Sequence, residues 1–350
     1  MRGQFDLNFY RSKRVLVTGH TGFKGAWLCR VLQLLGAEVT GYAQTPPTEP
    51  ALYTLAGIGN GMRSVTGDVC DFDALCRVFA EARPAVLLHL AAQPIVREGY
   101  RDPRGTFATN LMGTVNVLEA ARTCASLRSV LIVTTDKVYQ NSENAGALRE
   151  NAPLGGADPY SASKSCAEIA VQSYRTFFEN TALSTARAGN VIGGGDFAPD
   201  RILPDCVRAL RAGTPVALRN PLAVRPYQHV LEALFGYLMI AARQAEDPSL
   251  QGCYNVGPDE ADCRTTEALV ALFARAMGGV PAVEKAQECG PQEAACLRLD
   301  CSELARVFGW RPTWGLERAV EQTAAWTRAY MNGGDLLAVM DAQIREFIEA

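Results

Sequence analysis

A glycine-rich turn between an apolar strand and an apolar helix constrains the fold of this chain more than any other feature. The strand is expected over Arg14–Thr18 and the helix over Ala26–Leu35, and the turn between them reads Gly19-His20-Thr21-Gly22-Phe23-Lys24-Gly25. Glycines in this order permit a tight turn and a close approach of the backbone to a ligand, and the helix N-terminus stabilises a phosphate group. The sequence therefore predicts a dinucleotide-binding α/β domain.

The rest of the chain continues this alternation of strands and helices. Five more runs are expected to be strands separated by helical patterns: Glu38–Ala43, Ser64–Val69, Ala85–Gln93, Val130–Val133 and Ala182–Arg187. Such alternation gives right-handed crossovers and a mostly parallel sheet. From Gly189 onward the chain is rich in Gly, Pro and Arg. We therefore predict an α/β fold with two parts. Residues 1–188 form a Rossmann-type, doubly wound parallel sheet with a returning segment at about 229–258, and residues 189–228 and 259–350 form a smaller mixed α/β substrate-binding lobe.

The ends of the second, third and fourth strands indicate how the dinucleotide binds. Gln44 follows the second strand, where an Arg would select a 2′-phosphate, so NAD is favoured over NADP. Asp68 lies at the end of the third strand and either accepts from the adenine amino group or caps the next helix. Small residues at the end of the fourth strand leave room for a flat cofactor, and His89 is expected to be a packed strand residue. Besides the turn of Gly19, His20, Thr21, Gly22, Phe23, Lys24 and Gly25, the expected cofactor-binding residues are Asp68, Val69, Leu90, Ala91, Ala92, Gln93, Thr109, Tyr160 and Lys164.

Two polar clusters follow the fifth strand. The first is Thr134-Thr135-Asp136-Lys137, at the carboxyl end of the strand, where open α/β sheets place their chemistry. The second holds Tyr160 and Lys164, which are four residues apart and share one helix face. A Lys ammonium beside a Tyr hydroxyl favours the phenolate, so the Tyr is expected to take a proton near neutral pH. The expected catalytic residues are Thr135, Asp136, Lys137, Tyr160 and Lys164.

Composition limits the possible partners. The chain has 350 residues, 48% of them hydrophobic, and its formal net charge of −3 is dispersed, which argues against nucleic acid as a partner. No apolar run approaches the ~18 residues of a membrane span, so no membrane segment and a cytoplasmic protein are expected. The 11 cysteines form no Cys-x-x-Cys pair and the three histidines are far apart, which predicts reduced thiols and no metal site.

These residues together resemble the extended short-chain dehydrogenase/reductase family. Within it they resemble the CDP-glucose branch of the nucleotide-sugar 4,6-dehydratases. That branch has Thr-Asp-Lys after the fifth strand, as in Thr135-Asp136-Lys137, and a His in the glycine turn, as in His20. Two longer stretches, Arg187–Asp196 and Arg225–Val230, also match sequence motifs of this branch.

The resemblance implies a redox-neutral dehydration with NAD as cofactor. Tyr160, helped by Lys164, would remove the proton of the sugar's 4-hydroxyl while hydride passes to NAD. Lys137 would then take the C5 proton and Asp136 would protonate the leaving 6-hydroxyl. A second possibility stays open, in which Lys137 only stabilises the enolate and a water or His20 takes the proton.

The same resemblance assigns the substrate-binding residues. Arg201 and Arg225 would bind the diphosphate of a nucleotide sugar, because a guanidinium matches phosphate oxygens in two places, and Asn190 would bond to a phosphate or sugar oxygen. A homo-oligomer is implied as well. The alternatives are a nucleotide-sugar 4-epimerase, a dehydratase acting on a GDP, UDP or dTDP sugar, and a catalytically silent NAD-sensing interaction protein.

Overall fold

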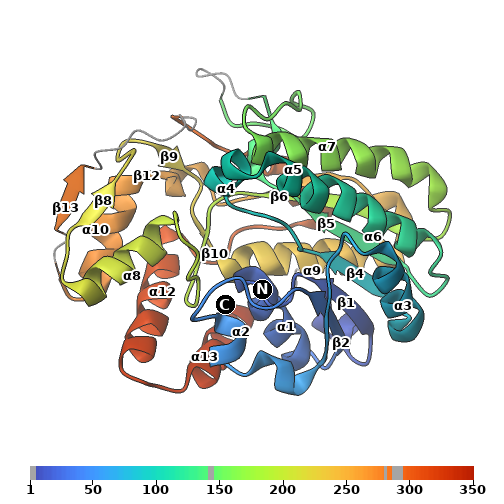
Figure 1. Ribbon diagram of the computed structural model, residues 1–350, viewed down its shortest axis with the longest axis horizontal. Helices are drawn as coiled ribbons and strands as arrows, with labels where there is room; N and C mark the ends of the chain where they lie inside the picture. Colours follow the sequence, from blue (N-terminus) through green and yellow to red (C-terminus); the bar gives the residue numbers. More distant parts are fainter. Residues whose placement is uncertain (1–4, 141–145, 280–281, 286–294) are drawn as a thin grey trace.

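The computed structural model describes residues 5–140, 146–279, 282–285 and 295–350, so the first four residues of the polar N-terminal arm lie outside it. A seven-stranded sheet crosses the larger part of the molecule, with strand order β11-β6-β5-β4-β1-β2-β3 (Figure 1). All its neighbouring strands pair in parallel. The strands are β1 (Arg14–Thr18), β2 (Glu38–Ala43), β3 (Arg63–Thr66), β4 (Val86–His89), β5 (Ser129–Val133), β6 (Ala182–Ala188) and β11 (Cys253–Val256).

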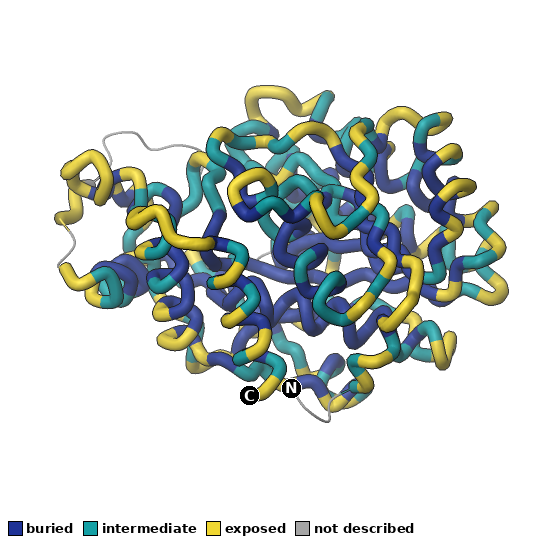
Figure 2. The backbone as a smooth tube through the Cα atoms, turned by 90° about the horizontal axis from the view of Figure 1, so that it is seen from below, coloured by how far each residue is buried: buried dark blue, intermediate teal, exposed yellow. Residues whose placement is uncertain are grey.

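Helices cover both faces of this sheet because successive strand residues point to opposite sides. In β1, Val15 and Val17 face one apolar cluster, with helices α1 and α9, while Leu16 faces the other, with helices α3, α6 and α7. The sheet is therefore doubly wound, as expected, and Figure 2 shows that buried residues are concentrated in the middle of the molecule. These helices are α1 (Phe23–Leu34), α3 (Phe72–Ala82), α6 (Gly113–Arg122), α7 (Pro159–Tyr174) and α9 (Val230–Glu246).

Strand β11 and helix α9 come from the returning segment expected at about 229–258. Helix α13 (Leu336–Glu349) also packs in the cluster of α1 and α9, through Met340, Ile344 and Phe347. So does α11 (Ser302–Phe308), through Leu304 and Phe308. The remaining short helices of the larger part are α2 (Leu52–Leu55), α4 (Val96–Arg101) and α5 (Pro103–Phe107).

A smaller mixed α/β lobe lies to one side of the sheet (Figure 1). Its apolar core joins α8 (Ile202–Ala212), α10 (Thr266–Ala276) and α12 (Leu316–Met331). Three two-stranded pairs accompany them: the parallel pairs β8 (Val216–Leu218) with β13 (Val283–Lys285) and β7 (Val191–Ile192) with β10 (Gln228–His229), and the antiparallel pair β9 (Val224–Arg225) with β12 (Arg264–Thr265). The fold class is therefore confirmed, whereas the residue bounds of the two parts stay a prediction.

From β1 the chain first adds β2 and β3 on one side of the sheet and then adds β4, β5 and β6 on the other, so the strand order reverses beside β1. Ligands of open α/β sheets bind in the crevice outside the carboxyl ends of the strands at such a point. Thr18 at the end of β1 lies beside His89 of β4 and Tyr42 of β2, so the glycine turn and the ends of these two strands meet there.

Candidate active site

Strand β5 and helix α7 bring the two polar clusters together. After β5, Thr135 begins a short 3₁₀ turn, η4 (Asp136–Val138), and its hydroxyl donates to Asp136 Oδ1 at 2.9 Å. The Thr135 side chain also acts on the phenol of Tyr160, in the first turn of α7, as one of the groups that lower its pKa. One helical turn later, Lys164 Nζ donates to the Val133 carbonyl at 3.1 Å. Four of the five expected catalytic side chains therefore form one buried cluster.

The carboxyl group of Asp136 has an exposed fraction of only 1%, yet one of its oxygens is unpaired. Asp136 Oδ2 has no hydrogen-bond partner among the described residues. The space it occupies exists because residue 189 is a glycine: a Cβ there would stand 2.1 Å from Oδ2. A buried, unpaired carboxyl oxygen is costly, so this atom is suited to a polar group of a ligand. Lys137, the fifth expected catalytic residue, lies half-buried on the same turn.

Burial controls the acid–base properties of Tyr160 and Lys164. It raises the pKa of Tyr160 to about 12, although the Thr135 hydrogen bond and the Arg201 charge oppose it. Burial, followed by the charge of Lys24, lowers the pKa of Lys164 to about 7, against the attraction of Glu168. In the protein alone, desolvation of the phenol outweighs the effects of Thr135 and Arg201, which lower its pKa. The expectation that Lys164 favours the phenolate stays a prediction.

The glycine turn is packed so closely that no side chain can be accommodated at two of its glycines. Gly19 has φ +77°, and a Cβ on it would lie 2.6 Å from the backbone N of Ala91, at the end of β4. A Cβ on Gly25 would lie 2.1 Å from the Gly19 carbonyl oxygen. Gly22 caps α1 without a side-chain hydrogen bond, so the first N–H groups of the helix remain available to an anion. Burial lowers the pKa of Lys24 in this turn to about 8, and the positive charge of Arg201 is the second cause.

The residues after β4 are held in place by a buried amide. Asn110 Oδ1 accepts from the Gln93 backbone N at 2.8 Å, and its Nδ2 donates to the Gln93 carbonyl at 3.0 Å and to Ser163 Oγ at 2.9 Å. Asn110 lies in a short π-helical turn, η3 (Ala108–Met112), and thus ties the end of β4 to helix α7. The four residues Leu90–Gln93 are all half-buried, as expected for residues that line a cofactor groove.

All three histidines have structural partners, and that of His229 is the Leu231 backbone N, 3.3 Å from its Nδ1. His20 Nε2 lies 2.7 Å from Ser64 Oγ on β3, and burial lowers the pKa of His20 to about 4. The ring therefore packs against Gly41 of β2 and Ser64 of β3, which supports a structural role, and the alternative that His20 takes the C5 proton stays a prediction. His89 lies between Thr18 Oγ1 at 2.7 Å and Thr114 Oγ1 at 3.2 Å and is a packed strand residue, as expected.

Asp68 does not cap the helix that follows it. Asp71 has that role, accepting from the Ala74 backbone N at 2.9 Å. Asp68 instead accepts from Gln44 Nε2 at 2.7 Å and from the Cys70 backbone N at 2.8 Å. Gln44, directly after β2, therefore contacts Asp68, the carboxylate expected to accept from the adenine amino group.

Two more of the residues expected to bind the cofactor lie near Asp68. Val69 is buried, and a Cβ on Gly113 of α6 would lie 2.6 Å from its Cγ2. Thr109, in η3, is hydrogen-bonded to the Cys70 side chain.

The arginines expected to bind the substrate lie in different surroundings. Arg201, just before α8, has Nη1 2.9 Å from Asp196 Oδ2, and its charge lowers the pKa of Tyr160. It therefore lies beside the catalytic cluster. Arg225, on β9, has an exposed fraction of 4%, and its Nη1 donates to the Val224 carbonyl at 2.9 Å. Asn190 is half-buried between β6 and β7, and its carbonyl accepts from the Gln228 backbone N at 3.3 Å.

Comparison with known proteins decides the family. Residues 15–257 match the model of the NAD dependent epimerase/dehydratase family. The chain belongs to this family. It is 41% identical over 354 residues to a CDP-glucose 4,6-dehydratase of Salmonella typhimurium, covering 99% of both chains. It is 30% identical over 324 residues to a dTDP-glucose 4,6-dehydratase of Streptomyces antibioticus, covering 90% of this chain and 92% of that one.

Solved structures of the family share the fold. The UDP-glucose-4-epimerase of Stenotrophomonas maltophila, with bound NAD and formylated UDP-arabinopyranose, superposes with a TM-score of 0.82. The identity is 21%, and the match covers 92% of this chain and 100% of that one. At this identity the likeness concerns the fold alone.

The geometry of this NAD dependent epimerase/dehydratase fits the cofactor of its family. The contact of Gly19 with Ala91 is a cradle that any Cβ would fill, and the uncapped start of α1 offers N–H groups to a pyrophosphate. In the described part of the chain, no group of three or more His, Cys, Asp or Glu side chains is placed to hold a metal ion. Over those same ranges, no helix is long and apolar enough to cross a membrane, and the cysteines described are all free thiols.

Sequence reasoning missed three residues of this site. Asn110 is a polar residue inside an apolar helix, and that contrast was an available signal. Gly189, directly after β6, makes room for Asp136, and a glycine at the end of a buried strand is a weaker signal. Asp196, whose partner is Arg201, is one of many loop carboxylates and carries no local signal.

Proposed function

We propose that this protein is a NAD-dependent hydro-lyase that converts CDP-D-glucose to the 4-keto-6-deoxy sugar. The observation that carries this proposal is the 41% identity, over 99% of both chains, with an enzyme named for that reaction. Thr135, Asp136 and Tyr160 support it, because an acid beside the oxidising Tyr is what loss of water requires beyond oxidation. The nucleotide-sugar substrate follows from the same relatives.

Tyr160 is our candidate for the first proton transfer. The glycine turn and Ala91 would hold NAD, which would supply the hydride acceptor for C4 and the hydride donor for C6. Tyr160 takes the proton of the 4-hydroxyl directly, as the general base of the oxidation. Because burial raises its pKa to about 12, the phenolate must be favoured by positive charge close to it. Arg201 already lowers this pKa, and Lys164, one helical turn from Tyr160, is our candidate for the remaining effect.

Asp136 and Lys137 are our candidates for the loss of water. The new 4-ketone acidifies the C5 proton, which a base on the adjacent turn removes, and we assign Lys137 to this role. The bond from C6 to its hydroxyl then breaks, and Asp136 in its acid form gives the proton that makes the leaving group water. The unpaired Asp136 Oδ2 supports this assignment, because it can bond to the 6-hydroxyl without breaking an existing hydrogen bond.

We assign Arg225 to the diphosphate of the nucleotide, together with Asn190. Arg225 lies on β9, and the next residue, Pro226, is 3.1 Å from where a Cβ on Gly189 would stand, so the chain here borders the Asp136 carboxyl group. The position of Arg201 beside Tyr160 and Asp196 supports a role nearer to the reacting hexose than the diphosphate assigned from the sequence.

A nucleotide-sugar 4-epimerase is the second candidate, since the solved epimerases share the fold. Epimerases need the Tyr-Lys pair but no acid and base for loss of water, so Asp136 and Lys137 favour the dehydratase. The test is to incubate the purified protein with CDP-, GDP-, UDP- and dTDP-glucose and follow the products by NMR. A 4-keto-6-deoxy product from CDP-glucose supports the proposal. An epimer, or preference for another nucleotide, contradicts it, and no product from any sugar favours the NAD-sensing alternative.

We also propose that the enzyme is a cytoplasmic homo-oligomer. The support is the resemblance to the extended short-chain dehydrogenases, together with the free thiols that a reducing compartment maintains. Light scattering during size-exclusion chromatography tests the oligomer: a mass of 37.8 kDa, that of one chain, would contradict it.

A further inference from the structure

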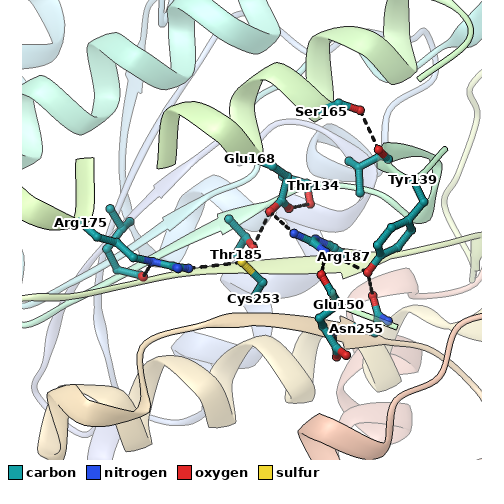
Figure 3. Close-up of polar contacts among 12 residues, drawn as sticks. Thr134, Tyr139, Glu150, Ser165, Glu168, Arg175, Thr185, Arg187, Cys253 and Asn255 are labelled. Atoms are coloured by element: carbon teal, nitrogen blue, oxygen red, sulfur yellow. Dashed lines mark hydrogen bonds and ion pairs between the residues drawn. The ribbon is translucent and has the colours of Figure 1, made fainter. Parts of the chain in front are cut away.

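A buried ion pair lies directly behind the catalytic cluster. Arg187 Nη2 is 2.7 Å from Glu168 Oε2, and the two side chains have exposed fractions of 1% and 0% (Figure 3). Glu168 lies on α7, one turn beyond Lys164 and two beyond Tyr160, so the three share a helix face. Arg187 comes from β6.

The ion pair holds the beginning of the catalytic turn. Thr134, at the end of β5, donates its hydroxyl to Glu168 Oε1. Thr185 of β6 donates to Glu168 Oε2 at 2.9 Å, so both carboxylate oxygens are bonded (Figure 3). Thr134 immediately precedes Thr135, whose hydroxyl contacts Asp136 and Tyr160.

The same ion pair also holds the end of the turn. Arg187 Nη1 donates to the Tyr139 hydroxyl at 3.0 Å, and the Tyr139 hydroxyl donates to Asn255 Oδ1 at 2.5 Å (Figure 3). The guanidinium carbon lies 5.0 Å from the centre of the Tyr139 ring. Arg187 Nη1 also donates to the Glu150 carbonyl at 2.9 Å. Thr134 and Tyr139 are the residues on either side of the segment 135–138, so both its ends are bonded to one ion pair.

Stability alone does not explain this arrangement. Removing two charges from water costs several kcal/mol, and replacing a buried pair with apolar residues is often neutral or stabilising. Directional bonds to both charges do, however, fix distances between elements in a way that apolar contacts do not. Here they fix the turn that carries Asp136 and Lys137 relative to the helix that carries Tyr160 and Lys164.

We infer that Glu168 and Arg187 are positioning residues, which keep the groups for loss of water in register with the groups for oxidation. This inference rests on the proposed function, because only a reaction with both steps needs the two sets of groups at one hexose. Neither residue contacts the reacting atoms. They act through Thr134 and Tyr139 on the turn between them.

The first test is Tyr139→Phe, which removes the bond to Arg187 while Thr134 remains bonded to Glu168. We expect the first oxidation, followed in a single turnover as reduced nicotinamide, to stay within about 2-fold of wild type. Loss of water should slow by about 10-fold or more, because small displacements of catalytic groups are costly. Reduced cofactor should then accumulate. Tyr10→Phe is the matched control: it removes a buried hydroxyl, bonded at 2.7 Å to the Leu238 carbonyl, and should change neither step.

The second test removes the pair itself. Glu168→Gln leaves Arg187 as an uncompensated buried cation, which destabilises the fold, so we compare it with the double variant Glu168→Gln, Arg187→Met. We expect the double variant to melt at a higher temperature than the single one and still to show the slower loss of water. Amide hydrogen exchange of residues 134–139, which needs no substrate, should be faster in Tyr139→Phe and in the double variant.

These outcomes separate the inference from the proposed function. If wild type gives no 4-keto product, the proposed function fails, and the exchange measurement alone decides the positioning role. If wild type gives the product, equal losses in both steps, or no loss in either, overturn the inference. Unchanged exchange over residues 134–139 overturns it in either case.

Discussion

Replacing Gly189 with alanine tests whether the place of the Asp136 carboxyl group determines loss of water. The added Cβ would stand 2.1 Å from Asp136 Oδ2, whereas ordinary contact begins at 3.4 Å, so the oxygen must move by 3.4 − 2.1, or about 1.3 Å. Misplacing a catalytic group by about 1 Å can cost about 100-fold in rate, or about 2.7 kcal/mol of barrier. We expect loss of water to slow by this factor.

The assay separates the two chemical steps. A single turnover with CDP-glucose reports oxidation by the appearance of reduced nicotinamide, and loss of water by the 4-keto-6-deoxy product. Oxidation should be nearly unchanged, because the atoms nearest to the added Cβ belong to Asp136 and Pro226 and not to Tyr160 or Thr135. Overpacking of this kind costs about 1–3 kcal/mol, so the variant should fold. Gly279→Ala is the control, because its Cβ would meet no described atom within 4 Å.

Two results would refute this reasoning. Loss of water at the wild-type rate would mean that Asp136 is not the acid, or that the turn moves freely. An equal fall in oxidation and loss of water would mean that Gly189→Ala disturbs the whole site, as a general packing defect would.

Three further variants test the other assignments. Tyr160→Phe should abolish oxidation, seen as no reduced nicotinamide in a single turnover; oxidation near the wild-type rate would contradict the role of Tyr160. Lys137→Ala should allow oxidation but block exchange of the C5 proton with deuterated solvent, and normal exchange would show that another group is the base. Lys164→Met should stabilise the fold below pH 7. Burial lowers the pKa of Lys164 from 10.5 to about 7, so the unfolded chain binds more protons between these values and stability rises with pH. After subtraction of the lost hydrogen bond to Val133, the free energy of unfolding of Lys164→Met at pH 6, measured with urea, should exceed that of wild type by about 2–4 kcal/mol. This difference should vanish toward pH 10.5. A difference that does not change with pH would contradict this cause.

The sequence predicted those parts of the fold and site that local patterns determine. The bounds of β1 and β2 agree with the structure, since each is an apolar run ended by a turn or a glycine. The spacing of Tyr160 and Lys164 placed them on one helix face, as observed. The order of strand, glycine turn and helix likewise placed Gly19 and Gly25 where a backbone without Cβ is required.

Partners distant in the sequence were not predictable in this way. The ring of His20 is bonded to Ser64, and Arg201 to Asp196, and each choice depends on how the finished elements pack. The raised pKa of Tyr160 has the same origin, because burial is a property of the whole fold. Glu168 and Arg187 resemble surface charges in the sequence, and only the fold removes them from water.

The internal transfer of hydrogen from C4 to C6 is the most direct test of the function proposed here. The protein would be incubated with CDP-glucose carrying deuterium at C4, and the product examined by NMR and mass spectrometry. We expect a 4-keto-6-deoxy sugar with the deuterium at C6. A hexose that keeps its deuterium at C4 with the configuration inverted, or a product whose deuterium is lost to solvent, would contradict the dehydratase assignment.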